Sequence, residues 1–280
     1  MSGLALEGAV VAITGAARGI GRATAHSFAA AGAHPCLGDL DGELASVVAA
    51  GLETDARGFS VDVASRESFA SFLAAVEREA GPPDILVNNA GVMPLGRFLD
   101  EDEATSQTTI AVNLGGVVNG MALALPGMVE RGHGHVVNVA SMMGKLVVPG
   151  AAVYGATKHA VVGLTATVRE ELAGTGVTAT TVLPAAVRTG LIAGVPLGGG
   201  LPSVDAKDVA AAIVQSCETR NGEVYVPGWL AGYDAAMTLT PGPVERIVRR
   251  LLRSDRVLTD LDEAERAGYD DGVQSQARPR

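Results

Sequence analysis

The sequence predicts an α/β protein in which one parallel sheet is covered by helices on both faces. Two observations support this prediction. Short apolar stretches of strand length alternate with longer helical stretches over residues 9–226, and no repeat, low-complexity segment or linker interrupts them. The chain is rich in Ala, Val, Leu and Gly and has only 4% aromatic residues, which suits helices packed closely on a buried parallel sheet.

The predicted strands are short, apolar and bounded by turn residues. They cover residues 9–14, 34–39, 59–63, 85–89, 135–141, 177–183 and 223–227. Among the helices between them, two begin at the cap residues Asp41 and Ser65, and Pro126 should disturb the longest. The helices cover residues 19–31, 41–50, 65–80, 101–131, 153–173 and 205–217. Folds of this kind bind ligands beyond the carboxyl ends of their strands.

Composition limits the function classes. The net charge of −10 argues against a nucleic-acid partner. Cys36 and Cys217 are far apart in apolar surroundings, so we expect neither a disulfide framework nor a metal site, and a reducing, cytoplasmic location fits best. We also expect no signal peptide and no transmembrane helix, because neither sequence pattern is found.

A glycine-rich turn, TGAARGIG at residues 14–21, follows the first strand and opens a helix. Gly15, Gly19 and Gly21 let a pyrophosphate approach the backbone, and a helix N-terminus favours its negative charge. The alternative is a plain turn in a chain that contains 36 Gly. The position after the first strand favours a dinucleotide site, and the absence of Gly-Lys-Ser/Thr argues against a P-loop.

Asp39, at the end of the second strand, bears on which dinucleotide binds. Its carboxylate can accept hydrogen bonds from the adenosine ribose and repels a 2′-phosphate, which favours NAD over NADP. Arg18 in the glycine turn instead favours NADP, because a guanidinium can pair with a 2′-phosphate. We give Asp39 more weight, because no basic residue occupies positions 39–41.

Polar residues also close the third and fourth strands. Asp62 follows the third strand, where it can receive the adenine amino group or simply cap a helix. The sequence Asn-Asn-Ala-Gly at residues 88–91 closes the fourth strand. Its carboxamides can bind backbone across the sheet and its small residues leave room for a sugar, although alone it would be interpreted as a turn.

Residues 141–158 contain a candidate proton-transfer site. Ser141 is followed by Tyr154 and Lys158, and the last two lie at i and i+4, on one face of a helix. An ammonium beside a phenol favours the phenolate, so we expect the pKa of Tyr154 to lie below its ordinary value of ~10. Taken singly, Ser141 can be an ordinary strand-end serine and Lys158 a solvated helix lysine.

Together these motifs resemble the classical short-chain dehydrogenase/reductase family, over roughly residues 6–227. TGAARGIG is similar to the family's T-G-x-x-x-G-x-G cofactor turn, Asn-Asn-Ala-Gly to its sheet motif, and Ser141 with Y-x-x-x-K to its catalytic residues. Asn113 falls where the family has a catalytic-site asparagine. PAAVRT at residues 184–189 resembles P-G-x-V-x-T, except that Ala185 replaces the glycine.

The resemblance implies a Rossmann-type doubly wound sheet of seven strands in the order 3-2-1-4-5-6-7. It also implies hydride transfer between a nicotinamide and an alcohol or ketone. Tyr154 would exchange the proton, Lys158 hold the nicotinamide ribose, Ser141 bind the substrate oxygen and Asn113 hold a relay water. The implied cofactor residues are Gly15, Arg18, Gly19, Ile20, Gly21, Asp39, Leu40, Asp62, Val63, Asn89, Ala90, Gly91, Tyr154, Lys158, Pro184, Val187 and Thr189.

The residues around the catalytic ones are apolar, which predicts a hydrophobic or lipid-like substrate. They are Met142, Met143, Val147, Val148, Pro149, Leu191, Ile192, Val195 and Leu197. Some of them can instead fill the core, as methionines often do. Residues 190–202 contain five glycines and two prolines, which is typical of a mobile flap over a site.

We divide the chain into a catalytic domain at residues 1–228 and a C-terminal extension at residues 229–280. Residues 243–258 form an amphipathic pattern, for which a docked helix is favoured over a substrate lid or contact with a membrane. The polar end from Glu263 is expected to be disordered. The resemblance further implies a homo-oligomer, either a dimer or a homotetramer.

Three functions compete at this point. The leading one is an NAD-dependent dehydrogenase acting on a hydrophobic secondary alcohol or ketone. The second is an NADPH-dependent 3-oxoacyl reductase. Asp39 argues against this function, and Arg18 argues for it. The third is a non-catalytic nucleotide-sensing regulator, which does not need a proton donor such as Tyr154.

Overall fold

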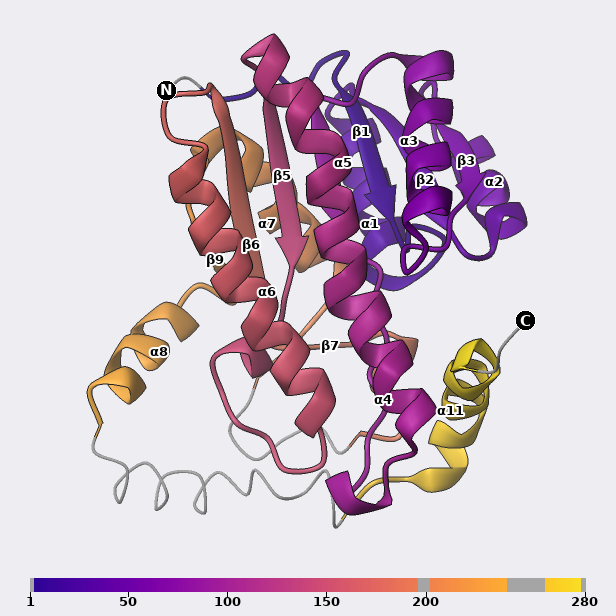
Figure 1. Ribbon diagram of the computed structural model, residues 1–280, viewed down its shortest axis with the longest axis vertical. Coiled ribbons are helices and arrows are strands. Elements are labelled where there is room, and N and C mark those ends of the chain that lie inside the picture. The colour runs from indigo at the N-terminus through magenta and orange to yellow at the C-terminus, as the bar shows by residue number, and fades with distance from the viewer. Residues whose placement is uncertain (1–2, 196–201, 241–259, 278–280) are drawn as a thin grey trace.

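The computed structural model describes residues 3–195, 202–240 and 260–277. Its main sheet has seven parallel strands in the order β3-β2-β1-β4-β5-β6-β9 (Figure 1). Because β9 is the seventh strand of that sheet along the chain, the predicted order is confirmed. The strands are β1 (Val10–Thr14), β2 (His34–Asp39), β3 (Arg57–Ser60), β4 (Ile85–Asn88), β5 (Gly134–Val139), β6 (Val177–Pro184) and β9 (Glu223–Val226).

Helices cover both faces of this sheet, as predicted. One layer contains α1 (Gly19–Ala30), α2 (Gly42–Ala50) and α7 (Ala206–Thr219), and the other contains α3 (Arg66–Ala80), α5 (Gly116–Arg131) and α6 (Ala152–Glu171). Alternate residues of one strand enter the two cores: Val11 and Ile13 of β1 pack on the first layer, and Val10 on the second. Each central strand is therefore buried on both faces.

Local signals placed the ends of several helices correctly. The Asp41 carboxylate accepts a hydrogen bond from the Leu44 N–H, and the Ser65 hydroxyl accepts one from Ser68, as expected of N-caps. The third strand was predicted too late, since it ends at Ser60. Asp62 therefore lies beyond the strand, in the turn that leads to α3.

The longest helical region differs from the prediction. It consists of α4 (Glu103–Ile110), a π-helical turn (Ala111–Gly115) and α5, and the helix continues through Pro126. The irregularity lies instead at Asn113, whose side chain is bonded to the backbone of Val92. A wide turn of this kind often marks a functional position. Pro126 does not end the helix, so the sequence placed the disturbance at the wrong residue.

The run from Glu103 to Arg131 is also long enough to cross a membrane and contains an 18-residue stretch with a mean hydropathy of 1.5. No transmembrane helix was expected from the sequence. This result rests on length and composition only, and a buried core helix of a globular domain also meets both criteria. Within the part of the chain that the structure describes, α5 packs against β4, β5 and α3. This packing accounts for its apolar face.

The C-terminal region differs most from expectation. A helix, α8 (Leu230–Thr238), follows the last strand, and a second, α11 (Glu263–Ala277), lies beside α4 where disorder was predicted (Figure 1). One face of α11 carries Arg266, Tyr269 and Val273, which are spaced at i, i+3 and i+7. Arg266 and Val273 are buried, and Tyr269 is half-buried. This spacing was hidden by the polar composition around it. The predicted amphipathic segment, residues 243–258, lies outside the described residues.

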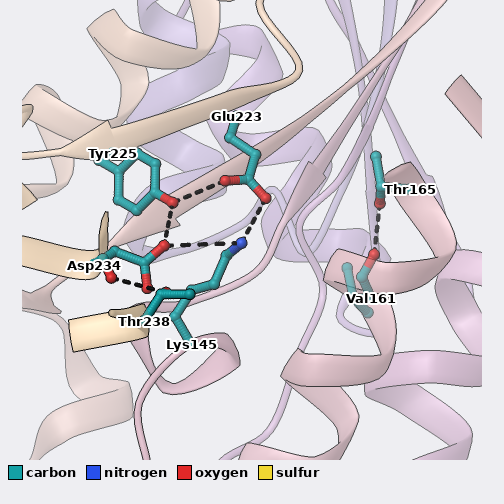
Figure 2. A network of polar contacts seen from close by, with 7 residues as sticks. All are labelled: Lys145, Val161, Thr165, Glu223, Tyr225, Asp234 and Thr238. Atoms are coloured by element: carbon teal, nitrogen blue, oxygen red, sulfur yellow. Dashed lines mark hydrogen bonds and ion pairs between the residues drawn. The ribbon is translucent and has the colours of Figure 1, made fainter. Parts of the chain in front are cut away.

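A polar network joins α8 to the sheet and to the loop after β5 (Figure 2). The Lys145 ammonium donates to Glu223 at 2.7 Å, and the Tyr225 hydroxyl lies 2.8 Å from Glu223 and 2.7 Å from Asp234 of α8. Burial and hydrogen bonds to these two carboxylates raise the pKa of Tyr225. Lys145 lies four residues after Ser141, so the network anchors one end of the segment that carries the candidate catalytic residues.

One buried histidine predicts how stability depends on pH. Burial, with Arg220 and Arg169 nearby, lowers the pKa of His135 from 6.5 to about 3. The unfolded chain therefore binds an extra proton between these values, so stability is intact above pH ~6.5 and falls as the pH drops toward 3. We expect His135→Gln to reduce this slope by roughly 1.4 kcal/mol per pH unit in urea unfolding between pH 6.5 and 4.5.

The exposed His159 gives the matched control. His159→Gln controls for the substitution itself, because this ring lies exposed on the surface of α6. Equal slopes in the wild type and the His135 variant would show that His135 does not dominate acid unfolding.

Candidate active site

The candidate site lies at the carboxyl ends of the strands, where the arrowheads of β1 and β5 point in Figure 1. A cavity of about 440 Å³ runs from the glycine turn, past the residues that follow β4 and β5, to α11. Residues far apart in the sequence line it, including Gly15, Asp39, Tyr154 and Tyr269. Of the predicted cofactor residues, all except Gly21 line this cavity.

Close backbone packing shapes the glycine turn. Gly15 (φ 63°) and Gly19 (φ 53°) have left-handed backbone angles, which disfavour other residues. A Cβ on Gly21 would collide with the Gly15 carbonyl, so Gly21 serves close packing and not the cavity wall. The Asn89 amide donates to the carbonyls of Thr14 (2.9 Å) and Gly15 (3.0 Å), which fixes the turn to β4.

The acidic and basic residues near the predicted adenosine end are paired in a specific way. Asp39 accepts hydrogen bonds from the backbone N–H groups of Ala17 (2.9 Å) and Asp41 (3.1 Å), so its carboxylate is fixed at the cavity wall. The Arg18 guanidinium donates to Asp41 at 2.7 Å. Backbone and Arg18 hydrogen bonds lower the pKa of Asp41. The Arg18 charge, which in the sequence favoured NADP, therefore has a carboxylate partner.

Asp62 does not cap α3, whose N-cap is Ser65, and its contact with the adenine amino group stays a prediction. Its carboxylate accepts from the Ala64 N–H at 3.0 Å, as a turn residue does, and it also lines the cavity beside Val63 and Leu40.

The candidate proton-transfer residues lie together in the cavity. Tyr154 and Lys158 lie one turn apart on α6, and the Lys158 nitrogen is 5.6 Å from the centre of the Tyr154 ring. This ammonium donates to the Val139 carbonyl at 2.9 Å, at the end of β5. The Ser141 hydroxyl accepts from the Met143 N–H at 3.1 Å. All three side chains line the cavity and are largely buried.

Burial reverses one expectation about this site. It raises the pKa of Tyr154 to about 12, with a hydrogen bond to Ser141 acting in the opposite direction and the nearby Tyr269 adding to the rise. Burial also lowers the pKa of Lys158 to about 8. The expected lowering of the Tyr154 pKa by Lys158 is therefore wrong for this structure, because desolvation of the phenolate dominates the shift.

Asn113 occupies a different place from the other three. It is fully buried and does not line the cavity. Its carboxamide accepts from the Val92 N–H and donates to the Val92 carbonyl, both at 2.8 Å, and donates to Thr157 at 3.3 Å. Asn113 thus holds the segment after β4 against α6. Its role in a water relay stays a prediction.

The predicted nicotinamide end lies after β6. Pro184, Val187 and Thr189 line the cavity, and a Cβ on Gly19 would lie 3.3 Å from Thr189, so the predicted nicotinamide end adjoins the glycine turn. Ala185, which replaces the family's glycine, donates its N–H to the Val226 carbonyl at 2.8 Å. Its φ angle is not positive, so alanine is accommodated there without strain. The following residues form a small unpredicted pair, β7 (Ala186–Val187) with β8 (Ser203–Val204).

The predicted substrate residues mostly face the cavity. Those that line it are Met142, Met143, Val148, Leu191, Ile192 and Val195. Val147 and Pro149 do not line it, and Val147 is 54% exposed. Leu197 and residues 196–201 of the predicted flap lie outside the described residues.

Sequence reasoning missed part of the wall. Met93, Leu95 and Leu146 line the substrate end, and so does Tyr269 of α11. Met93 and Leu95 lie two and four residues after the end of the Asn-Asn-Ala-Gly motif, so their position was a usable signal. Tyr269 is far in sequence from the other cavity residues. Its helical spacing from Arg266 and Val273 was the only sequence signal that this face of the helix packs against the protein.

Comparisons with known proteins agree with this arrangement. The family model "short chain dehydrogenase" matches residues 9–196. "Probable oxidoreductase EphD" of Mycobacterium tuberculosis is 40% identical over 190 residues, which are 66% of this chain but only 32% of that protein. The chain therefore spans about a third of the length of that relative.

Two further matches extend over nearly the whole length of the related chain. The "3-oxoacyl-[acyl-carrier-protein] reductase FabG" of Thermotoga maritima is 33% identical over 84% of this chain and 99% of its own length. A crystal structure of a short-chain dehydrogenase/reductase from Burkholderia phymatum in complex with NAD is 27% identical, with a TM-score of 0.76 over 85% of this chain and 98% of that one. With the family model covering most of the sheet and the cavity built from the family's motifs, the chain belongs to the short-chain dehydrogenase/reductase family of oxidoreductases.

Proposed function

We propose that this protein is an NAD(H)-dependent dehydrogenase that interconverts a hydrophobic secondary alcohol and its ketone. One observation carries the proposal. Ser141, Tyr154 and Lys158 converge at the point where the cavity passes from the glycine turn to an apolar pocket. A nicotinamide on one side and an apolar carbonyl compound on the other would meet at the Tyr154 hydroxyl.

The residues present fit a dinucleotide. The left-handed Gly15 and Gly19 leave backbone at the cavity wall for a pyrophosphate, and Asp39 is fixed where it can accept hydrogen bonds from a ribose. The Arg18–Asp41 ion pair supports NAD over NADP, because a 2′-phosphate would have to compete with a carboxylate for this guanidinium. The NAD complex of the structural relative supports the same cofactor.

Bound NAD would supply the hydride chemistry, and the chain's own residues would supply position and a proton. Tyr154 is a protonated phenol at neutral pH, since its pKa lies near 12, so it suits proton donation to a carbonyl oxygen. Ser141 would bind the same oxygen and stabilise the charge that develops on it. Lys158, with a pKa of about 8, is positioned to hold ribose hydroxyls and stabilise a phenolate when the alcohol is oxidised.

The second candidate is an NADPH-dependent 3-oxoacyl reductase, which the full-length similarity to the Thermotoga maritima protein favours. Asp39 and the paired Arg18 argue against its cofactor. A nucleotide sensor without catalysis is the third candidate, and the convergence of Ser141, Tyr154 and Lys158 argues against it.

The wider assignments remain part of this proposal. We infer a homodimer or homotetramer, because α4 and α5 expose Ile110, Val118 and Val129 on their outer face. The free, buried cysteines Cys36 and Cys217 are compatible with a reducing, cytoplasmic setting. The division at residue 228 is likewise proposed, with α8 and α11 as a docked extension.

A cofactor titration followed by a substrate panel tests the function. We expect NADH to bind more tightly than NADPH, and hydrophobic secondary alcohols and ketones to turn over faster than small charged keto acids. Preferential turnover of charged keto acids would contradict the apolar pocket. Tighter binding of NADPH would instead favour the 3-oxoacyl reductase.

A further inference from the structure

The apolar substrate end of the cavity contains one phenol that the proposed reaction does not use, that of Tyr269. This end is lined by Met93, Leu95, Met143, Leu146, Val148, Leu191, Ile192 and Val195. Tyr269 reaches it from α11, more than a hundred residues after Tyr154 in the sequence. Both phenols line the same cavity, and Met93 packs with Tyr154 and bonds to the Tyr269 hydroxyl.

The Tyr269 hydroxyl is oriented by the backbone opposite. Its oxygen accepts a hydrogen bond from the Met93 N–H at 2.8 Å. No described residue accepts a hydrogen bond from the hydroxyl in return. Burial raises the pKa of Tyr269 to about 12, so the hydroxyl keeps its proton at neutral pH. An O–H group held in this way in an apolar pocket is a hydrogen-bond donor that a ligand can satisfy.

Arg266 fixes the helix that carries this phenol. Its side chain is only 1% exposed and its guanidinium lies 4.4 Å from the Tyr269 ring centre. It donates to the carbonyls of Leu191 and Met93, which line the pocket from two separate segments of the chain, and pairs with Asp270 at 3.1 Å. A buried arginine with this many partners costs much to displace, because each broken bond would leave a buried charge or carbonyl unsatisfied.

The loop after β7 packs closely against the start of α11. Gly194 has a left-handed φ of 69°, and a Cβ there would collide with the Asp262 carbonyl. The Asp262 N–H also donates to the Gly194 carbonyl at 2.9 Å. These contacts position α11 over the substrate end, so the placement of Tyr269 is set by several independent interactions.

We propose that Tyr269 is a specificity-determining residue whose hydroxyl donates a hydrogen bond to a second oxygen of the substrate. The preferred substrate would then be an apolar alcohol or ketone that carries another oxygen acceptor, such as a keto or ester oxygen, away from the reacting carbon. This inference rests on the proposed function, because it assumes that the carbonyl group reacts at Tyr154. It adds a requirement that an apolar pocket by itself does not impose.

Binding to the enzyme–NAD⁺ complex tests the inference without requiring turnover, since NAD⁺ cannot reduce a ketone. The probes are a medium-chain 2-ketone and its analogues with a second keto group at successive positions along the chain. By calorimetry we expect at least one diketone to bind about 10-fold more tightly than the plain ketone, as one hydrogen bond to a neutral donor allows. Tyr269→Phe should abolish this difference and leave binding of the plain ketone unchanged within about twofold.

Tyr233→Phe is the matched control, because Tyr233 does not line the cavity, and it should keep the wild-type difference. Equal binding of all ketones by the wild type, or no binding of any, would overturn the role of Tyr269. An equal loss for plain and oxygenated ketones in Tyr269→Phe would overturn it as well, since that result indicates a structural effect on the Met93 segment. Failure of the proposed function gives a different result, namely normal ketone binding with no turnover on NADH.

Discussion

Replacing Tyr154 by phenylalanine is expected to lower kcat roughly 10²- to 10⁴-fold, the usual contribution of a positioned proton donor. The substitution removes only the hydroxyl, so the buried ring should still pack against Met93 and Ala151. Binding of NADH should change little, because the Lys158 ammonium keeps its bond to the Val139 carbonyl. Steady-state reduction of a hydrophobic ketone, with a parallel fluorescence titration of NADH, measures both quantities.

Tyr225→Phe provides a comparison at a half-buried phenol. Tyr225 bonds to Glu223 and Asp234, outside the cavity (Figure 2), so its loss should affect thermal stability and leave kcat near the wild-type value. If Tyr154→Phe retained wild-type turnover, the proposed proton transfer would be refuted.

Replacing Asp39 by asparagine is expected to shift the ratio of kcat/KM for NAD to that for NADP toward NADP by on the order of 100-fold. The substitution keeps the size of the side chain and removes the negative charge that would face a 2′-phosphate. Placing like charges together costs several kcal/mol, and each 1.4 kcal/mol corresponds to about a factor of ten. Initial rates with both cofactors at fixed substrate give the ratio directly.

Two further substitutions sharpen this test. Asp41→Asn should shift the ratio in the same direction but less, because it releases Arg18 from its 2.7 Å ion pair. Asp55→Asn, which removes a carboxylate paired with Arg57 outside the cavity, should leave the ratio unchanged. A wild-type enzyme that already prefers NADP would show that Asp39 has been misinterpreted.

Local patterns in the sequence determined much of the fold. The alternation of apolar strands with helices, together with the family resemblance, predicted the parallel sheet and its strand order. Asp41 and Ser65 marked helix starts because a cap depends on a side chain and the next three or four residues. The glycine turn and the i, i+4 spacing of Tyr154 and Lys158 predicted which residues meet at the strand ends, since parallel strands bring their carboxyl ends to one edge.

The tertiary structure decided the properties that depend on what surrounds a side chain. The sequence showed that Lys158 lies beside Tyr154, but burial, which it could not show, sets the direction of the Tyr154 pKa. Arg18 was ambiguous until its pairing with Asp41 was visible. Asn113 was placed in a regular helix, whereas its bonds to Val92 accompany a π-helical turn.

The C-terminal helix is the clearest case. Its composition is polar, so sequence reasoning predicted disorder, and nothing in its local pattern identified Met93, Leu191 or Gly194 as partners. The order of this segment depends on long-range contacts of Arg266 and Tyr269 with Leu191 and Met93. These contacts can form only when the sheet holds the Leu191 and Met93 segments in place. The sequence alone thus determined the family of oxidoreductases and predicted a site at the strand ends. Tertiary contacts decided how α11 closes one end of the cavity, because those contacts join residues that no local pattern relates.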